Sequence, residues 1–239
     1  MPPFQPQMAI PRPGLIVVSS LREQIYDYLK EAMQLGRLQP GATLDLKALE
    51  QEIGISRTPL RDALLQLAAE GFVEILPRRG VRVVALSIER IRDHYEILAA
   101  LEGTALRNGA TRITPEHVDH MEQLNETMRS ALADDDFDEF YALNLQFHEC
   151  WLDLSDNREL KRTVRILKQR LYDFPRNPGF IKEWEENSTH EHAQIVAHLR
   201  AGDVNAAADY VRDVHWSFTV QEKFIRRYYA AQVHGTREE

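Results

Sequence analysis

The chain of 239 residues has a single cysteine and no long apolar run. One cysteine, Cys150, cannot form a disulfide within the chain, and its apolar neighbours Phe147 and Trp151 favour a buried side chain over a nucleophilic thiol. No stretch approaches the length needed to cross a bilayer, and prolines interrupt the N-terminal segment MPPFQPQMAIPRPG where a signal peptide would have an apolar core. We therefore expect a cytoplasmic protein with no membrane partner and a flexible arm over residues 1–18.

An excess of positive charge is also missing, since the formal net charge is -8 at pH 7. This balance argues against a protein that coats nucleic acid. The charge is uneven, however, because residues 1–86 hold ten Lys/Arg against nine Asp/Glu, and the remainder carries the whole negative excess. With 44% hydrophobic and 28% charged residues, the chain has an ordinary globular composition and is long enough for two domains.

Residues 56–84, SRTPLRDALLQLAAEGFVEILPRRGVRVV, predict a helix followed by a β-hairpin. Ser56 can cap the helix start, and Pro59 is tolerated in the first turn because its missing N–H is not needed there. Leucines repeat at helical spacing on one face, which leaves a basic surface at the helix start. Two short β segments, 72–76 and 81–85, follow and are joined by a turn with the sequence PRRG.

The residues before this hairpin complete a recognisable unit. An amphipathic helix over about residues 21–33 is followed by the Gly/Pro-punctuated connection GRLQPGATL and by a short helix that stops at Gly54. The order is therefore helix, helix, turn, helix, wing. Single exposed arginines are usually ordinary solvated surface, but a helix with arginines in its first turn and a basic hairpin together suit a DNA major groove.

The segment AMQLGRLQPGATLDLKALEQEIGISRTPLRDALLQLAAEGFVEILPRRG resembles the winged helix-turn-helix domain of the GntR family of bacterial transcription regulators, and the match runs from about residue 19 to 86. The G-x-L-x-P-G turn, the S-R-T-P-L-R start and the E-G-F-V ending occur in order. The resemblance implies base and phosphate contacts from the third helix, one contact from the second helix, and entry of the wing tip into the minor groove. The expected DNA-binding residues are Lys47, Ser56, Arg57, Thr58, Arg61, Arg79 and Gly80.

No strand pattern follows residue 86. Apolar periodicity predicts helices over about residues 87–107, 114–132, 137–154, 157–173, 183–201 and 204–231, with a break at FPRNPGF. The acidic run at 134–136 is most simply a solvated loop. The expected fold is mainly α, with an N-terminal winged helix-turn-helix domain that has a small β-wing (19–86), an all-helical bundle (87–233) and a short tail (234–239).

Three histidines interrupt the apolar faces of three predicted helices. They are His148, His192 and His215, and Asn144 lies one turn before His148. A lone histidine in such a position is most often a core residue bonded to a neighbour. Three on separate inward faces, together with a polar amide, instead indicate one divalent metal, because helices of a bundle can aim imidazoles at one point. Zinc is the first expectation, with nickel or manganese as alternatives.

The second half resembles the FadR C-terminal ligand-binding domain, called FCD, over about residues 88–225. The matching pieces are YEILAALEGTAL, NLQFHECWLDLSDN and EHAQIVAHLRAGD. The resemblance implies a divalent metal held by a D-x-x-x-H pair and two later histidines, at the base of a cavity for a small organic acid. The three histidines fall on those positions.

Two positions depart from the FCD pattern. Asn144 replaces the usual Asp, which removes a negative charge from the metal's shell and should lower its affinity for the ion. Leu98 stands where many members have an Arg that helps to hold the effector. Tyr95 and Arg165 are the candidate effector contacts, with Arg165 as a replacement cation.

These features predict a ligand-responsive transcription regulator, a repressor, that binds a palindromic operator as a homodimer. A metal-dependent enzyme fused to a DNA-binding module is the first alternative, since three histidines also describe a hydrolytic zinc site. No positioned acid or base accompanies them, so we expect no enzymatic activity. A metal-sensing regulator without an organic effector is the other alternative.

Overall fold

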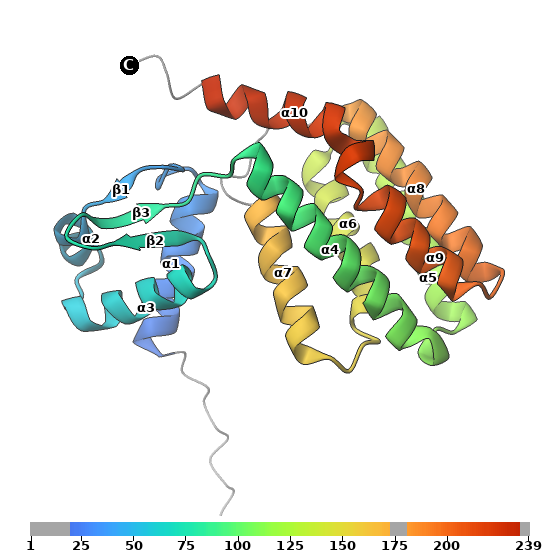
Figure 1. Cartoon of the computed structure of the whole chain (residues 1–239), viewed down its shortest axis with the longest axis horizontal. Helices are drawn as coiled ribbons and strands as arrows, with labels where there is room; N and C mark the ends of the chain where they lie inside the picture. The colour runs from blue at the N-terminus through green and yellow to red at the C-terminus, as the bar shows by residue number, and fades with distance from the viewer. Residues whose placement is uncertain (1–19, 173–180, 235–239) are drawn as a thin grey trace, which may run out of the picture.

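A computed structural model of the chain describes residues 20–172 and 181–234, without the side chains of 230–234. Figure 1 shows a small N-terminal domain beside a larger bundle of helices. The predicted arm, the FPRNPGF break and all but the first residue of the predicted tail lie outside the described residues. No helix within the described residues combines the length and apolarity needed to cross a membrane.

The N-terminal domain is a winged helix-turn-helix unit, as predicted. Its helices begin at side-chain caps or at an extended residue, and its strands form one antiparallel sheet in the order β1-β3-β2. The elements are α1 (Leu21–Gln34), β1 (Thr43–Leu44), α2 (Leu46–Ile53), α3 (Arg57–Ala69), β2 (Val73–Leu76) and β3 (Gly80–Val83).

Two details of this domain differ from the sequence prediction. The segment 43–44 pairs with β3 as a third strand, although its two residues in a Gly/Pro-rich connection give no period-2 pattern to detect. Ser56 occupies the N-cap position of α3 with an extended backbone, but its side chain makes no capping hydrogen bond. The hydroxyl of Ser56 therefore remains exposed at the start of α3.

The C-terminal domain is all-helical within the described residues. Five of its helices lie within two residues of the predicted bounds. They are α4 (Ile88–Gly109), α5 (Pro115–Ala133), α6 (Phe137–Leu152), α7 (Arg158–Tyr172) and α8 (Lys182–Arg200). Ser87 caps α4, and Thr114 forms a capping box with His117 at the start of α5.

The prediction of one continuous helix over 204–231 was wrong. The segment divides into α9 (Val204–Tyr210), a π-helical turn (Val211–His215) and α10 (Phe218–His234). The N–H of Trp216 donates to the carbonyl of Val211 at 2.9 Å, which closes the wide turn. π turns are rare and have no sequence spacing of their own in the helical pattern, so periodicity does not reveal this one, and such turns often mark functional sites. His215 is the last residue of this turn.

Helix α4 runs through the bundle core, and residues on its buried face are shielded from solvent along its whole length. One close approach fixes the α4–α9 packing. A Cβ added at Gly103 would lie 3.1 Å from the carbonyl oxygen of Ala208, which is tighter than ordinary van der Waals contact. Glycine at position 103 therefore lets the two backbones come together next to Glu102.

The two domains touch through α7. Ile166 packs against the N-terminal core, Arg162 bonds Glu70 at 3.1 Å, and Gln169 accepts from Lys30 at 2.6 Å. The start of α4 contacts the wing, because Arg90 bonds Glu74 of β2 at 3.0 Å. In Figure 1, α7 and the start of α4 lie on the side of the bundle that faces the N-terminal domain.

We expect Gly103→Val to lower the free energy of unfolding by about 1–3 kcal/mol, because the extra carbons overpack the α4–α9 contact. Chemical denaturation measures the change. Ala100→Val is the matched control, since Ala100 is exposed on the same helix and tests only helix propensity. Equal losses in the two variants would show that the close approach at Gly103 does not contribute.

Candidate metal centre and DNA-binding surface

Three helical segments bring the predicted histidines together. His148 lies on α6, His192 on α8 and His215 at the end of the π turn, and their ligand atoms all lie within 4.8 Å of one another. His148 and His192 are buried, with 1% and 0% of their surfaces exposed. Because the three lie on different helices, the bundle itself sets the geometry of the cluster.

Carboxylates orient two of these imidazoles. His148 Nδ1 lies 2.7 Å from Glu102 Oε2, and His215 Nδ1 lies 2.7 Å from Glu191 Oε2. A carboxylate accepts from Nδ1–H, so the lone pair of each neutral ring is on Nε2. The two Nε2 atoms face each other at 3.2 Å. Carboxylate–histidine pairs of this kind are the usual outer partners of metal ligands.

His192 supplies a second observation that fits a metal. Neither of its buried ring nitrogens has a hydrogen-bond partner among the described residues. A buried polar atom without a partner costs roughly 1–3 kcal/mol. A cation held by the three imidazoles would satisfy one of these nitrogens, so the residues present fit a divalent ion.

The electrostatics favour neutral imidazoles. Burial, with help from Lys168, lowers the pKa of His148 to about 3 in spite of Glu102, and burial holds the pKa of His192 well below its usual range. Burial alone would raise the pKa of Glu102, but His148 and Lys168 outweigh it and keep the pKa low. Lys168 Nζ lies 2.8 Å from Glu102 Oε1. Metal ligation requires deprotonated imidazoles, and burial favours that form at His148 and His192.

Glu102, Lys168 and Glu191 are not among the residues that the sequence predicted for this site. The first two carry a signal that was present, since each lies within the apolar stripe of its helix and each is at most 5% exposed. Charged residues are almost never fully buried unless they are paired. Glu191 gives no such signal, because its position beside His192 is on the edge of the apolar face.

Asn144 lies at the cavity with its buried Oδ1 free of hydrogen bonds to any described residue. The side chain is one turn before His148 on α6, so it faces the same side of the helix. An amide oxygen can coordinate a hard or borderline cation, although more weakly than a carboxylate. The structure thus brings Asn144 close to the cluster that the sequence predicted.

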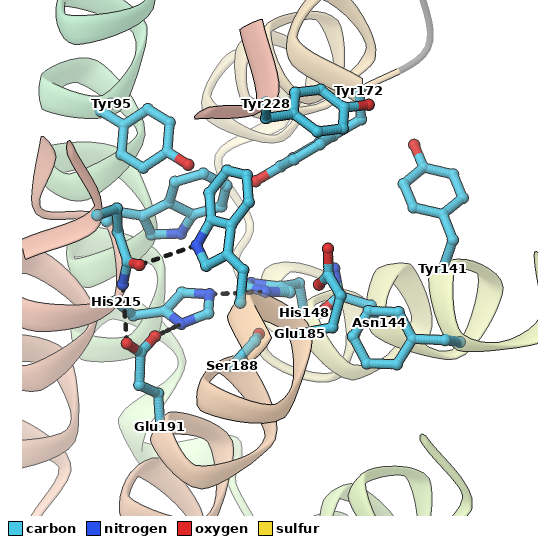
Figure 2. Close-up of a pocket in the computed structure, with 14 residues that line it drawn as sticks. Tyr95, Tyr141, Asn144, His148, Tyr172, Glu185, Ser188, Glu191, His215 and Tyr228 are labelled. Carbon is cyan, nitrogen blue, oxygen red and sulfur yellow. Dashed lines mark hydrogen bonds and ion pairs between the residues drawn. The ribbon is translucent and has the colours of Figure 1, made fainter. Parts of the chain in front are cut away.

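His148 and His215 line one end of a cavity of about 60 Å³. In Figure 2, His148, His215 and Glu191 lie below and Tyr95, Tyr172 and Tyr228 lie above. This volume admits a metal-bound ligand of a few heavy atoms, since one water needs about 10–15 Å³. Half of its lining residues are aromatic, namely Tyr95, Phe140, Tyr141, Tyr172, Trp184, Trp216 and Tyr228.

The two candidate effector contacts have different positions. Tyr95 is 3% exposed and lines the cavity. Arg165 does not line it, because its side chain is 47% exposed on α7 and binds Glu149 and Asp153. The replacement cation suggested by the sequence is therefore engaged at the surface, away from the histidines.

The predicted DNA-binding residues are all exposed in the N-terminal domain, on α2, α3 and the wing. Among the described residues, the guanidinium groups of Arg57 and Arg61 form no ion pair, whereas Arg82 is held by Glu74 at 2.9 Å. At the wing tip Arg78 has φ 62°, which turns the chain sharply. Unpaired cations on a helix start and at a wing tip are free to meet phosphates.

Comparisons with known proteins confirm the predicted family of each half of the chain. Residues 21–83 match the family model described as "Bacterial regulatory proteins, gntR family", and residues 93–214 match that of the FCD domain. An HTH-type transcriptional repressor, RspR of Escherichia coli, is 29% identical over 148 residues, which are 62% of this chain and 65% of the relative. The matched stretch thus spans just under two thirds of that relative.

Other relatives cover more of the chain. A regulator encoded in an unstable DNA locus of Streptomyces ambofaciens, named as an uncharacterized HTH-type transcriptional regulator, is 30% identical over 196 residues, or 80% of each chain. The solved structure of McbR/YncC from E. coli has the same fold, with a TM-score of 0.63 at 23% identity over 90% of this chain and all of that one. The matching family model and both relatives are described as transcription regulators, which sets aside the enzyme alternative. The chain belongs to the gntR family of bacterial transcription regulators, in the group whose C-terminal half is an FCD domain.

Proposed function

We propose that this protein is a cytoplasmic repressor that binds a palindromic operator as a homodimer and responds to a small organic acid held at a divalent metal. The observation that carries the proposal is the histidine cluster, in which two carboxylates aim the Nε2 atoms of His148 and His215 at each other beside unpartnered His192. A purely structural core would have no reason to leave those nitrogens facing one another.

The metal would be held by the three imidazoles, with Asn144 as a weak or water-bridged fourth partner. Nitrogen ligands favour zinc, with nickel or manganese as alternatives. When bound, the ion supplies a positive charge that can take one oxygen of an organic acid. Glu102 and Glu191 keep the imidazoles oriented and make them better donors.

The two-fold operator and the dimer follow from the size of the recognition unit. One recognition helix contacts too few base pairs for specificity, so paired half-sites about one helical turn apart are expected. A repressor is favoured by the name of the relative RspR, which is described as a transcriptional repressor. The helical domain would supply the dimer contacts.

Coupling between the sites would pass through Glu102. Its carboxylate joins α4 to His148 of α6 and to Lys168 of α7. The opposite face of α7 carries Arg162, Ile166 and Gln169, which contact the N-terminal domain. A ligand that shifts His148 would therefore move a charged group on the helix that supports the DNA-binding domain.

We expect Arg57→Ala and Arg61→Ala each to weaken operator binding. The loss is about 1–3 kcal/mol if the arginine contacts a base. If it contacts a phosphate, the slope of log affinity against log salt concentration falls by about one unit. Binding isotherms at several salt concentrations measure both effects. Arg22→Ala is the control, since Arg22 is an exposed arginine of the same domain on α1. Parent-like binding by both α3 variants would place the recognition surface elsewhere.

We expect one divalent metal per chain. Elemental analysis of protein purified without added metal, followed by zinc titration of the stripped protein, tests this stoichiometry. His192→Ala should abolish tight binding, and Glu191→Gln should weaken zinc by roughly 10–100-fold, because it loosens the orientation of His215. His198→Ala, on the same helix outside the cluster, should leave zinc affinity unchanged. Failure of the parent to bind zinc at micromolar concentration would overturn the proposed site.

We expect small organic acids to include one that changes the operator affinity of the metal-loaded protein about 5–150-fold. In the double variant Arg162→Ala, Gln169→Ala this factor should shrink while acid affinity stays the same, because the α7 contacts with the N-terminal domain are lost. Arg158→Ala, exposed at the start of α7, is the control. Since linkage is reciprocal, operator DNA must change acid affinity by the same factor, and calorimetry on free and DNA-bound protein checks this equality.

An operator affinity that responds to metal alone, and to no acid, would favour the alternative of a metal sensor. An unchanged coupling factor in the double variant would show that α7 does not transmit the signal.

A further inference from the structure

The wall of the cavity has an unusual balance of charge. Its lining includes the carboxyl groups of Glu185 and Glu191, but no lysine or arginine among the residues that the structure describes. A pocket for a simple anion would offer a cation at the end opposite the metal. Here that end is formed by aromatic rings, as Figure 2 shows for Tyr95, Tyr172 and Tyr228.

The two carboxyl groups differ in whether they form hydrogen bonds or ion pairs with other described residues. Glu191 accepts from His215 through Oε2 and from Gln221 through Oε1, at 2.7 and 2.8 Å, so both of its oxygens are used. Glu185 forms no hydrogen bond or ion pair within the described part of the chain. Burial raises the pKa of Glu185 to about 8, as expected for an acid that lacks a cationic partner.

The buried cation Lys168 does not offset Glu185, because it is engaged elsewhere. Lys168 lies over the ring of Trp216, 5.4 Å from its centroid, but its ammonium is paired with Glu102 at 2.8 Å. Two further polar atoms at the cavity, Asn144 Oδ1 and Trp216 Nε1, have no hydrogen-bond partner among the described residues. The cavity thus offers a free acid, an amide oxygen and an indole N–H, within aromatic walls.

Aromatic faces attract organic cations, and Glu185 adds to that attraction in its ionised form, which a nearby ammonium group favours. An acid with no positive group would instead meet repulsion from Glu185 whenever that residue is ionised. The absence of an arginine at Leu98, which is fully buried and apolar, is consistent with this difference in ligand charge.

We propose that the effector is a zwitterion, an organic acid that also carries an ammonium group. Its carboxylate takes the metal at the histidine end, and its ammonium lies against Glu185 and the surrounding rings. This assignment rests on the proposed function, because the metal anchors the carboxylate.

The test uses full-length zinc-loaded protein and two matched series of ligands in calorimetry. Glycine, β-alanine and 4-aminobutyrate carry the ammonium, while glycolate, 3-hydroxypropionate and 4-hydroxybutyrate replace it by a hydroxyl. The three chain lengths cover different distances from the metal to Glu185. We expect the ammonium member to bind at least about tenfold tighter at one chain length, corresponding to about 1.4 kcal/mol.

Two variants test whether the preference for the ammonium ligands comes from Glu185. Glu185→Gln should abolish it, whereas Glu186→Gln, a change at the adjacent exposed position, should retain it. An amine that ligates zinc directly would also bind tightly, but its advantage would persist in Glu185→Gln. Persistence of the preference in that variant, equal or tighter binding of every hydroxy acid, or no binding of any amino acid at millimolar concentration would each overturn the inference.

A separate titration with zinc shows whether a negative result overturns only the zwitterion assignment or also the proposed function. Protein that binds one zinc per chain but shows no preference for the ammonium series retains the proposed metal site and loses only the assignment of the ligand. Protein that binds no zinc overturns the proposed function itself.

Discussion

The arrangement of the helical domain depends on the contacts of one buried carboxylate, that of Glu102, with His148 and Lys168. Removing an ionised carboxyl from water costs several kcal/mol unless good geometry and further hydrogen bonds offset the loss. Glu102 is fully buried, and its two oxygens are taken by His148 and Lys168 at 2.7 and 2.8 Å. Loss of either partner would leave a charge buried without compensation, so α4, α6 and α7 are held in one arrangement.

A second carboxylate performs the same task from the other side. Glu191 fixes His215, while Gln221 of α10 donates to Glu191 and accepts from Trp184. The π turn is what places His215 within reach, because a regular helix would rotate position 215 away from its observed direction. His148 and His215 therefore owe their directions to carboxylates, and His215 also to a local change in helix type.

The sequence predicts the features that depend on local patterns, but not those that depend on pairs of residues far apart in the chain. Periodicity and capping predict the helices up to α8 in order, but they do not predict the π turn that divides 204–231. The N-terminal unit and the three histidines follow from patterns of single residues. Non-local pairing escapes such patterns, as with the short strand at 43–44 and the Glu102–Lys168 pair. Arg165 shows the same limit, since helical spacing gives the face of α7 that it occupies but not its acidic partners Glu149 and Asp153.

The two departures from the FCD pattern have related electrostatic effects. An amide at Asn144 in place of a carboxylate removes a negative charge from the site. With a divalent ion present, Glu102 and Lys168 cancel each other, and Glu191 offsets half of the metal's charge. One positive charge would then remain at the histidine end and could attract a carboxylate without an arginine at Leu98. In the proposed site the metal would thus replace the charge of that arginine, and Glu185 and the aromatic wall would be left to select the ligand by its other charge.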